Sequence, residues 1–271
     1  MIISYKNNRN QTVNLDQEPY FMAVSDFLDY EWDYSESHGV ARQFYRSIKT
    51  RKLKIDVYGD TERSARKNQN ILTEIFEYDI AKKAAGRLYV GEYWLPCYII
   101  ACAKTDWEDT TRMVSCEYTL LTESGMWMKK TEYHFRGVSG EKVGGFDFPY
   151  DFPVDFVSAV SANRIMNDAV SESNMELRIY GPADKPAVII GDHMYGVRCT
   201  VADHEIVKIN TKNRKALLIH GDGGIENIFP FRNREQYIYD PVPAGESVVS
   251  TNGFFDHDVI LLTERSEPEW T

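Results

Sequence analysis

The sequence has few cysteines and no long apolar run. Its four cysteines, Cys97, Cys102, Cys116 and Cys199, lack both Cys-x-x-Cys spacing and the density of a secreted disulfide scaffold, so we expect free thiols. No stretch approaches eighteen unbroken apolar residues, and the first residues show no basic region followed by an apolar one. We therefore expect synthesis in the cytoplasm and no membrane insertion.

Positive charge is also scarce. The chain has 31 Lys and Arg against 41 Asp and Glu, which gives a formal net charge of -10. Proteins that bind nucleic acid use clustered Lys and Arg to neutralise phosphates. The charge balance therefore argues against a phosphate-binding surface, and we expect no sequence-specific nucleic-acid binding.

Catalytic signatures are missing as well. The sequence contains no G-x-S-x-G, H-E-x-x-H, G-x-x-x-x-G-K-[ST] or G-x-G-x-x-G pattern. Histidines stand beside carboxylates at Asp192-His193, Asp203-His204 and Asp256-His257-Asp258, but neighbouring residues of a strand point to opposite faces. A hydrolase that uses His193 or His257 is therefore the weakest hypothesis, and we expect no enzyme activity, no cofactor and no metal site.

The first half of the chain has the pattern of a mixed α+β domain. Apolar alternation predicts a strand over residues 51–60, and a helix follows that starts near Asp60 or Thr61. Its apolar stripe comprises Ile71, Leu72, Ile75 and Phe76. The Gly91-Glu92 dipeptide predicts a tight hairpin between residues 87–90 and 93–103, and a further strand is expected at 113–121.

The second half is typical of an all-β domain. Short strand patterns alternate with Gly, Pro, Asn and Asp clusters, and no helical stripe occurs among them. With 43% apolar residues, 271 residues can form two compact domains. This half therefore predicts an antiparallel β-sandwich, with strands at 175–181, 187–192, 194–201, 204–210, 215–220, 236–240, 246–250 and 258–264.

An aromatic run, FDFPYDFPVDF, lies between these halves at residues 146–156. Its aspartates, Asp147, Asp151 and Asp155, suggest a calcium site, but residues four apart in an extended chain are roughly 13 Å apart. Proline favours extended geometry before it, so the run predicts a stiff linker with one aromatic edge. Its linker residues are Phe146, Phe148, Pro149, Tyr150, Phe152, Pro153 and Phe156. We expect domains at 1–138 and 158–271 with a linker at 139–157.

Five stretches, in order along most of the chain, resemble the distal tail protein family of siphophages and related prophages. They are IFEYDIAKKAAGRLYVGEYWLPCYIIACAKTDW (75–107), YDFPVDF (150–156), LRIYGPADKPAVIIGDHMYGV (177–197), ENIFPFRNREQYIY (226–239) and VPAGESVVSTNGFFDHDVILLTERSEPEW (242–270). Each stretch is a structural motif, and the family supplies no active site.

The resemblance implies a structural hub at the distal end of a long non-contractile tail. Six copies would form a ring with a channel for DNA, and the amino-terminal domain would dock on the tail tube. The carboxy-terminal domain would be a galectin-like sandwich, whose last strand returns to the first domain in some relatives. Implied partners are the tail tube protein, the tail-associated tip protein and receptor-binding or baseplate proteins, at the virion tail tip. For the ring contact we select exposed elements of the first domain, Tyr89, Tyr93 and Trp94.

A rival hypothesis is a carbohydrate-binding module. Sandwiches often bind sugars, and aromatic side chains combine contact area with a polar group. In this hypothesis Tyr195, Tyr237 and Phe254 would bind a host cell-wall glycan. Fold analogy alone does not establish such binding.

Overall fold

The computed structural model describes residues 2–23, 26–106, 112–137 and 163–269. Within these residues the protein is mainly β, with one α-helix, as predicted. The expected linker, 139–157, lies outside the described residues. Among the helices that are described, none is both long and apolar enough to cross a membrane.

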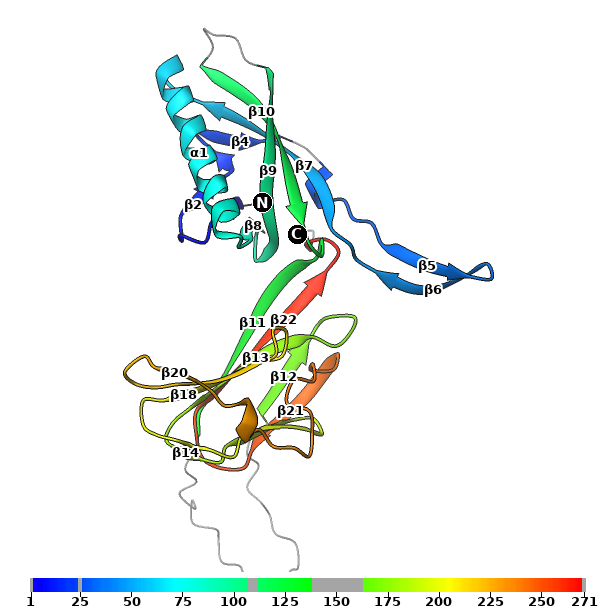
Figure 1. Cartoon of the computed structure of the whole chain (residues 1–271), viewed down its shortest axis with the longest axis vertical. Coiled ribbons are helices and arrows are strands. Elements are labelled where there is room, and N and C mark those ends of the chain that lie inside the picture. The colour runs from blue at the N-terminus through cyan, green and yellow to red at the C-terminus, as the bar shows by residue number, and fades with distance from the viewer. Residues whose placement is uncertain (1, 24–25, 107–111, 138–162, 270–271) are drawn as a thin grey trace, which may run out of the picture. The chain divides into compact units, whose positions relative to one another are not determined.

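The chain divides into two compact units. Residues 1–129 and 264–271 form the first, and residues 130–263 form the second (Figure 1). The division falls inside two strands, β11 (Trp127–Phe135) and β22 (His257–Arg265). The chain thus changes units without a turn, and its last residues belong to the first unit.

The first unit is an antiparallel sheet covered by a helix. Strands β9, β10, β7, β4 and β3 are neighbours in that order, β8 pairs with β9 and with β1, and β1 pairs with β2. The strands and the short 3-10 helix are β1 (Ile3–Lys6), β2 (Thr12–Asn14), β3 (Asp16–Gln17), β4 (Tyr20–Met22), η1 (Asp26–Leu28), β5 (Asp33–Ser37), β6 (Val40–Tyr45), β7 (Lys49–Tyr58), β8 (Gly86–Val90), β9 (Tyr93–Asp106) and β10 (Met113–Thr122).

The predicted helix is α1 (Glu62–Lys82). Thr61 is its N-cap: the Thr61 side chain accepts from the Ser64 backbone N–H at 3.2 Å, and Ser64 Oγ accepts from the Thr61 backbone N–H at 2.9 Å. This capping box satisfies two N–H groups that the helix cannot pair internally. The expected hairpin also forms, because Gly91 adopts the positive φ of 58° that its turn requires.

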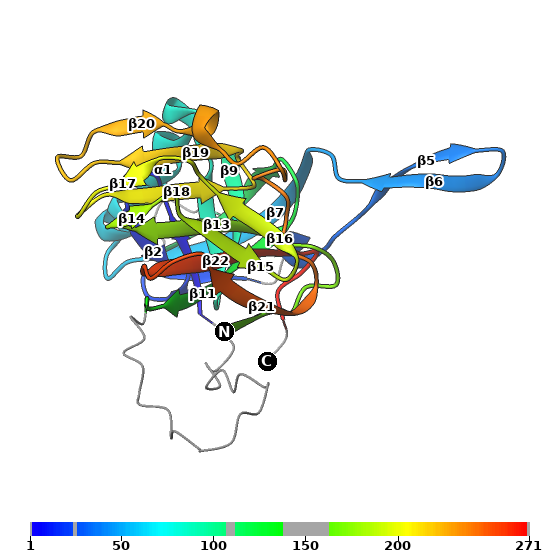
Figure 2. The same ribbon diagram turned by 90° about the horizontal axis from the view of Figure 1, so that it is seen from below.

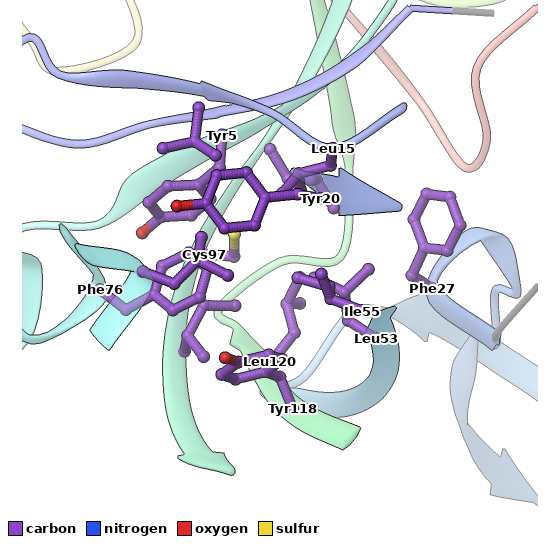
Figure 3. Close-up of a cluster of buried hydrophobic side chains, with 14 of the residues drawn as sticks. Tyr5, Leu15, Tyr20, Phe27, Leu53, Ile55, Phe76, Cys97, Tyr118 and Leu120 are labelled. Carbon is purple, nitrogen blue, oxygen red and sulfur yellow. The ribbon is translucent and has the colours of Figure 1, made fainter. Parts of the chain in front are cut away.

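A continuous apolar core lies between α1 and the sheet. Leu72, Ile75 and Phe76 of the predicted stripe are buried against residues of β7, β9 and β10. Figure 3 shows Phe76 close to Tyr5 and Tyr118, and its ring meets both edge-on at centroid distances of 4.9 and 5.3 Å. The sequence pattern therefore predicted most of the buried helix face, but Ile71, the fourth residue of the stripe, is 38% exposed.

A buried carboxylate fixes the first strand to the helix. Asp79 of α1 has no exposed surface and accepts from the Tyr5 hydroxyl at 2.6 Å. It also accepts from the Asn8 backbone N–H and the Asn8 side-chain amide, both at 2.8 Å. Gly86 leaves room for this group, since a Cβ there would lie 2.1 Å from the Tyr5 hydroxyl oxygen. Asp79 thus joins three segments of the unit.

The second unit is a β-sandwich. Its larger sheet has the order β20-β19-β18-β13-β22-β11 (Figure 2), and its smaller sheet has the order β12-β21-β15-β16. Their apolar faces share one core that includes Leu177, Val207, Val188 and Tyr195. The remaining elements are β12 (Asn163–Asn167), β13 (Asn174–Tyr180), β14 (Ala183–Asp184), β15 (Ala187–Ile190), β16 (His193–Gly196), β17 (Thr200–Val201), β18 (Ile206–Asn210), β19 (Lys215–Ile219), β20 (Ile225–Asn227), η2 (Phe229–Phe231) and β21 (Gly245–Thr251).

Two strand predictions in this unit were wrong. Residues 236–240 form a loop, in which Ile238 and Tyr239 are buried but do not join a ladder. The stretch 194–201 divides into β16 and β17, since Val197 forms only an isolated bridge, to Arg232. In both cases apolar side chains are buried although their backbone is irregular. Alternation of apolar and polar residues in the sequence cannot distinguish such a loop from a strand.

His257 is a buried histidine in the core of the sandwich. Its ring stacks on Phe135 at a centroid distance of 4.9 Å, and Nδ1 lies 3.4 Å from the Phe255 carbonyl oxygen. Nε2 is buried without a hydrogen-bond partner among the described residues. Burial lowers the pKa of His257 below its ordinary value of 6.5.

Replacing Asp79 by alanine should destabilise the protein. The buried Tyr5 hydroxyl loses its acceptor, and an unsatisfied buried donor costs about 1–3 kcal/mol. Asn8 is exposed, and its side-chain amide keeps the Ala84 and Ala85 carbonyl oxygens as acceptors. We expect Asp79→Ala to lower the free energy of unfolding by about 3 kcal/mol in urea titrations. Glu74→Ala, at an exposed position of the same helix, is the control and should change it by less than about 0.5 kcal/mol. Equal losses in both variants would contradict the role given to Asp79.

Acidification should destabilise the second unit through His257. The unfolded chain binds a proton near pH 6.5, whereas the folded chain binds it only at the lowered pKa. Stability is therefore lost as pH falls from about 6.5 to the lowered pKa, and the loss then levels off. His257→Phe keeps an aromatic ring and should reduce the decrease in Tm between pH 7.5 and 5. The exposed-histidine variant His204→Asn should retain the full decrease.

Candidate functional site

The most exposed element of the first unit is a hairpin formed by β5 and β6, here called the arm. Its turn is His38-Gly39, where both residues have positive φ, 55° and 75°. This geometry matches the right-handed twist of a tight hairpin. The two strands pair only with each other in the described part of the chain. Figures 1 and 2 both show the arm extending away from the sheet of its own unit.

Large apolar side chains cover the arm without being buried. Tyr34 and Phe44 lie opposite each other in the register, are 59% and 63% exposed, and have ring centroids 6.5 Å apart. Isolated two-stranded hairpins are marginal in water, and contiguous exposed apolar surface marks interaction sites. The other exposed apolar residues of the arm and its base are Tyr30, Trp32, Val40, Tyr45 and Ile48. The arm therefore exposes apolar side chains of the kind found at interaction sites.

Arg46 organises the base of the arm. Its guanidinium carbon lies 4.0 Å from the centroid of the Trp32 ring and 5.6 Å from that of Tyr30. Nη1 donates to the Glu31 carbonyl oxygen at 3.1 Å, and Nη2 donates to the Ser266 hydroxyl. The residues that follow β22 thus contact the base of the arm within the same unit.

An ion pair adds to this base. Lys49 Nζ lies 2.8 Å from Asp33 Oδ1 and 3.3 Å from Glu31 Oε2, and Ser47 Oγ donates to Asp33 Oδ2 at 2.6 Å. The Lys49 and Ser47 hydrogen bonds hold the pKa of Asp33 below its ordinary value. These contacts fix the base of the arm, although the strands of the arm itself are exposed.

The three residues selected for the ring contact lie on two different faces. Tyr93 is only 7% exposed and belongs to the core, with its hydroxyl 3.4 Å from Arg265 and from Glu269. Tyr89 and Trp94 pair across β8 and β9, are half-buried, and have centroids 6.4 Å apart. Of the three, only these two are exposed enough to remain candidates for a contact surface.

The residues proposed for sugar binding do not form one surface. Tyr195 is buried, and its hydroxyl donates to the Asp240 carbonyl oxygen at 2.9 Å. Tyr237 and Phe254 are exposed, and Tyr237 lines a cavity whose described lining does not include Phe254. The two histidines of the hydrolase hypothesis are engaged with backbone carbonyls, His193 with Tyr237 at 3.0 Å and His257 with Phe255.

No cluster of three metal-binding side chains occurs in the residues that the structure describes. Asp147, Asp151 and Asp155 lie outside these residues, as do the aromatic and proline residues of the predicted linker.

Sequence reasoning missed the arm. Its signal was present in the opening fifty residues, where His38-Gly39 separates two segments with aromatic residues. Both faces of the arm are exposed to solvent, so neither face needs to be uniformly apolar. Polar residues therefore stand between the aromatic ones, and the apolar–polar alternation typical of a strand is obscured.

Comparison with known proteins gives a match at the level of structure only. No family model and no curated protein matches the sequence. Among solved structures, the chain is similar to the Dit protein of phage SPP1, a paradigm of the hub adsorption apparatus in phages that infect Gram-positive bacteria. The TM-score is 0.62 at 8% identity, over 98% of this chain and 100% of that one.

The chain is also similar to a protein of the phage p2 baseplate in its activated conformation. The TM-score is 0.65 for the baseplate with Ca and 0.64 for that with Sr. In both cases identity is 13%, and the match covers 99% of this chain and 100% of the other. At this level of identity these likenesses show a shared fold.

Removing the Arg46 side chain should loosen the arm. Arg46→Ala loses the stack on Trp32 and the hydrogen bonds to Glu31 and Ser266, so we expect chymotrypsin to cleave the aromatic positions of the arm several-fold faster. Arg46→Lys keeps the charge but not the planar stack and should be intermediate. Arg42→Ala, on the exposed arm itself, is the matched control. Cleavage at the wild-type rate in Arg46→Ala would show that the arm is fixed by other contacts.

Proposed function

We propose that this protein is a structural hub of a long non-contractile phage tail. Six copies form a closed ring that joins the tail tube to the tip protein and to receptor-binding or baseplate proteins, and the ring leaves a channel for DNA. The protein acts at the virion tail tip after synthesis in the host cytoplasm. It has no catalytic activity, and its mechanism is assembly.

The observation that carries this proposal is the likeness of the entire chain to phage hub and baseplate proteins. The alignments include both units, and they cover all of each matched chain. A shared sandwich alone would be weak support, because sandwiches serve many functions. Here the match covers nearly all of this chain, so it includes both the helix-covered sheet and the sandwich.

The arm supports ring formation. An arm that binds a different surface on a second copy makes a heterologous contact, and repeated rotation closes such contacts into a ring. Tyr34 and Phe44 would lose solvent exposure in this contact, and aromatic residues are enriched in interface cores. Tyr89 and Trp94 provide a second aromatic surface in the same unit.

Charge on the arm should prevent ring closure. We expect wild-type protein to reach about six times its 31.3 kDa mass in light scattering over a concentration series, with six-fold rings in negative-stain images. The double variant Tyr34→Asp/Phe44→Asp should remain monomeric, because burying two unpaired carboxylates is unfavourable. Both positions are exposed, so the unfolding midpoint should stay close to that of the wild type.

Phe254→Asp provides the control for added charge, since Phe254 is exposed in the second unit. It should assemble as the wild type does. If the arm variant still formed rings, the contact would lie elsewhere. A folded wild-type protein that stays monomeric at every concentration would contradict autonomous assembly.

A further inference from the structure

The second unit contains a cavity of about 580 Å³ at the end of its larger sheet. Lys215 and Leu217 of β19 and Asn227 of β20 lie on one face of the paired strands, because Leu217 is opposite Asn227 in the register. The aromatic loop that was predicted as a strand closes the other side. The cavity belongs to the second unit, whereas the arm and the β8–β9 surface belong to the first.

Stacked aromatic rings form one wall of the cavity. Phe229 and Tyr239 are nearly parallel, with centroids 5.4 Å apart and an interplanar angle of 7°. Tyr237 meets Tyr239 edge-on at 5.6 Å and is 47% exposed. Arg232 covers Phe229, with its guanidinium carbon 3.9 Å from the ring centroid. These contacts fix the rings in place before any ligand binds.

The rim of the cavity is positively charged. Arg214 and Lys215 line it, and both are exposed. No carboxylate lines the cavity, so neither cation has an acidic partner within the lining. The contrast with the chain as a whole is strong, since acidic residues outnumber basic ones by 41 to 31. The rim therefore complements an anionic group.

We propose that this cavity binds an acidic saccharide. The C–H face of a sugar ring would pack on Tyr237 and the wall behind it. Its carboxylate or phosphate would accept hydrogen bonds from Arg214 and Lys215, and the Asn227 side-chain amide would bond a hydroxyl. An apolar wall with a few convergent polar groups is the usual composition of small-ligand sites.

A sugar fits this cavity better than an acidic polypeptide does. Polypeptides commonly bind a sheet by adding a strand to its edge, which requires a run of free backbone groups. The edge strand here, β20, has only three residues. The cavity instead places the flat ring of Tyr237 near two neighbouring cations, Arg214 and Lys215. This combination suits a ring-shaped ligand that carries negative charge.

Calorimetry on the full-length protein tests the proposal with four probes. The first is a hexamer of α-1,4-galacturonate, which carries carboxylates. The second is an oligomer of glycerol phosphate, which carries phosphates, and these two probes distinguish the sources of the negative charge. The third is the methyl-esterified galacturonate hexamer, which has the same sugar backbone without charge, and the fourth is poly-glutamate.

We expect at least one anionic carbohydrate-type probe to bind, and its affinity to fall as salt is raised. Tyr237→Ala and the double variant Arg214→Gln/Lys215→Gln should each weaken it by about tenfold or more. Phe254→Ala and Lys185→Gln are matched controls, an exposed aromatic and an exposed cation outside the cavity, and should bind as the wild type does. Thermal unfolding confirms that each variant is folded.

Three results would overturn the proposal. The first is that neither anionic probe binds at millimolar concentration. The second is that the neutral ester binds as tightly as the free acid. The third is that poly-glutamate binds as tightly as the saccharide and that Tyr237→Ala weakens it equally. The last result would identify the cavity as a docking surface for an acidic protein. None of these outcomes depends on ring assembly, which the mass measurement tests separately.

Discussion

The apolar face of each β-strand must be covered by another layer, and the architecture of this protein follows from how each strand meets that requirement. Successive side chains of a strand point to opposite faces, so a sheet with one apolar face needs a partner. In the first unit α1 supplies it, with Leu72, Ile75 and Phe76 packed on the sheet. In the second unit two sheets cover each other. Among the described residues no second layer covers the arm, and for that reason we propose it as the part that an assembly partner completes.

The sequence predicted those parts of the fold in which local chemistry and packing agree. Thr61 caps α1 because its side chain can accept a backbone hydrogen bond, and Gly91 allows the hairpin because it tolerates positive φ. The strand at 51–60 corresponds to β7, whose alternation reports the single face that α1 covers. The sandwich was recognisable from its turn residues, since short strands need frequent turns. Each of these signals lies within a few residues of the structure that it specifies.

Features that depend on distant residues were not predictable. β11 crosses from one unit to the other without a turn, so no composition change marks the division at Lys129 and Lys130. Residues 236–240 resemble a strand because Ile238 and Tyr239 are buried, yet stacking on Phe229 rather than a ladder holds that loop. The cavity that we propose for an acidic saccharide depends on this loop. Of its residues, only Tyr237 was selected from the sequence, and its basic rim comes from a different segment of the chain.

An arginine lies over an aromatic ring both at the base of the arm and at the cavity. The two places differ in whether their other positive charges have acidic partners. At the base of the arm, Arg46 stacks on Trp32, and Lys49 is neutralised by Asp33 and Glu31, so the positive charges there are used within the unit. At the cavity Arg232 covers Phe229, while Arg214 and Lys215 have no acidic partner among the residues that line it. A contact that excludes water gains little from unpaired cations, because their desolvation is costly. A hydrated sugar site tolerates them, since water and the ligand both provide acceptors. In the proposed ring, the arm would make the lasting contact between copies and the cavity would bind its ligand reversibly. Repeated copies in that ring would strengthen such binding through avidity.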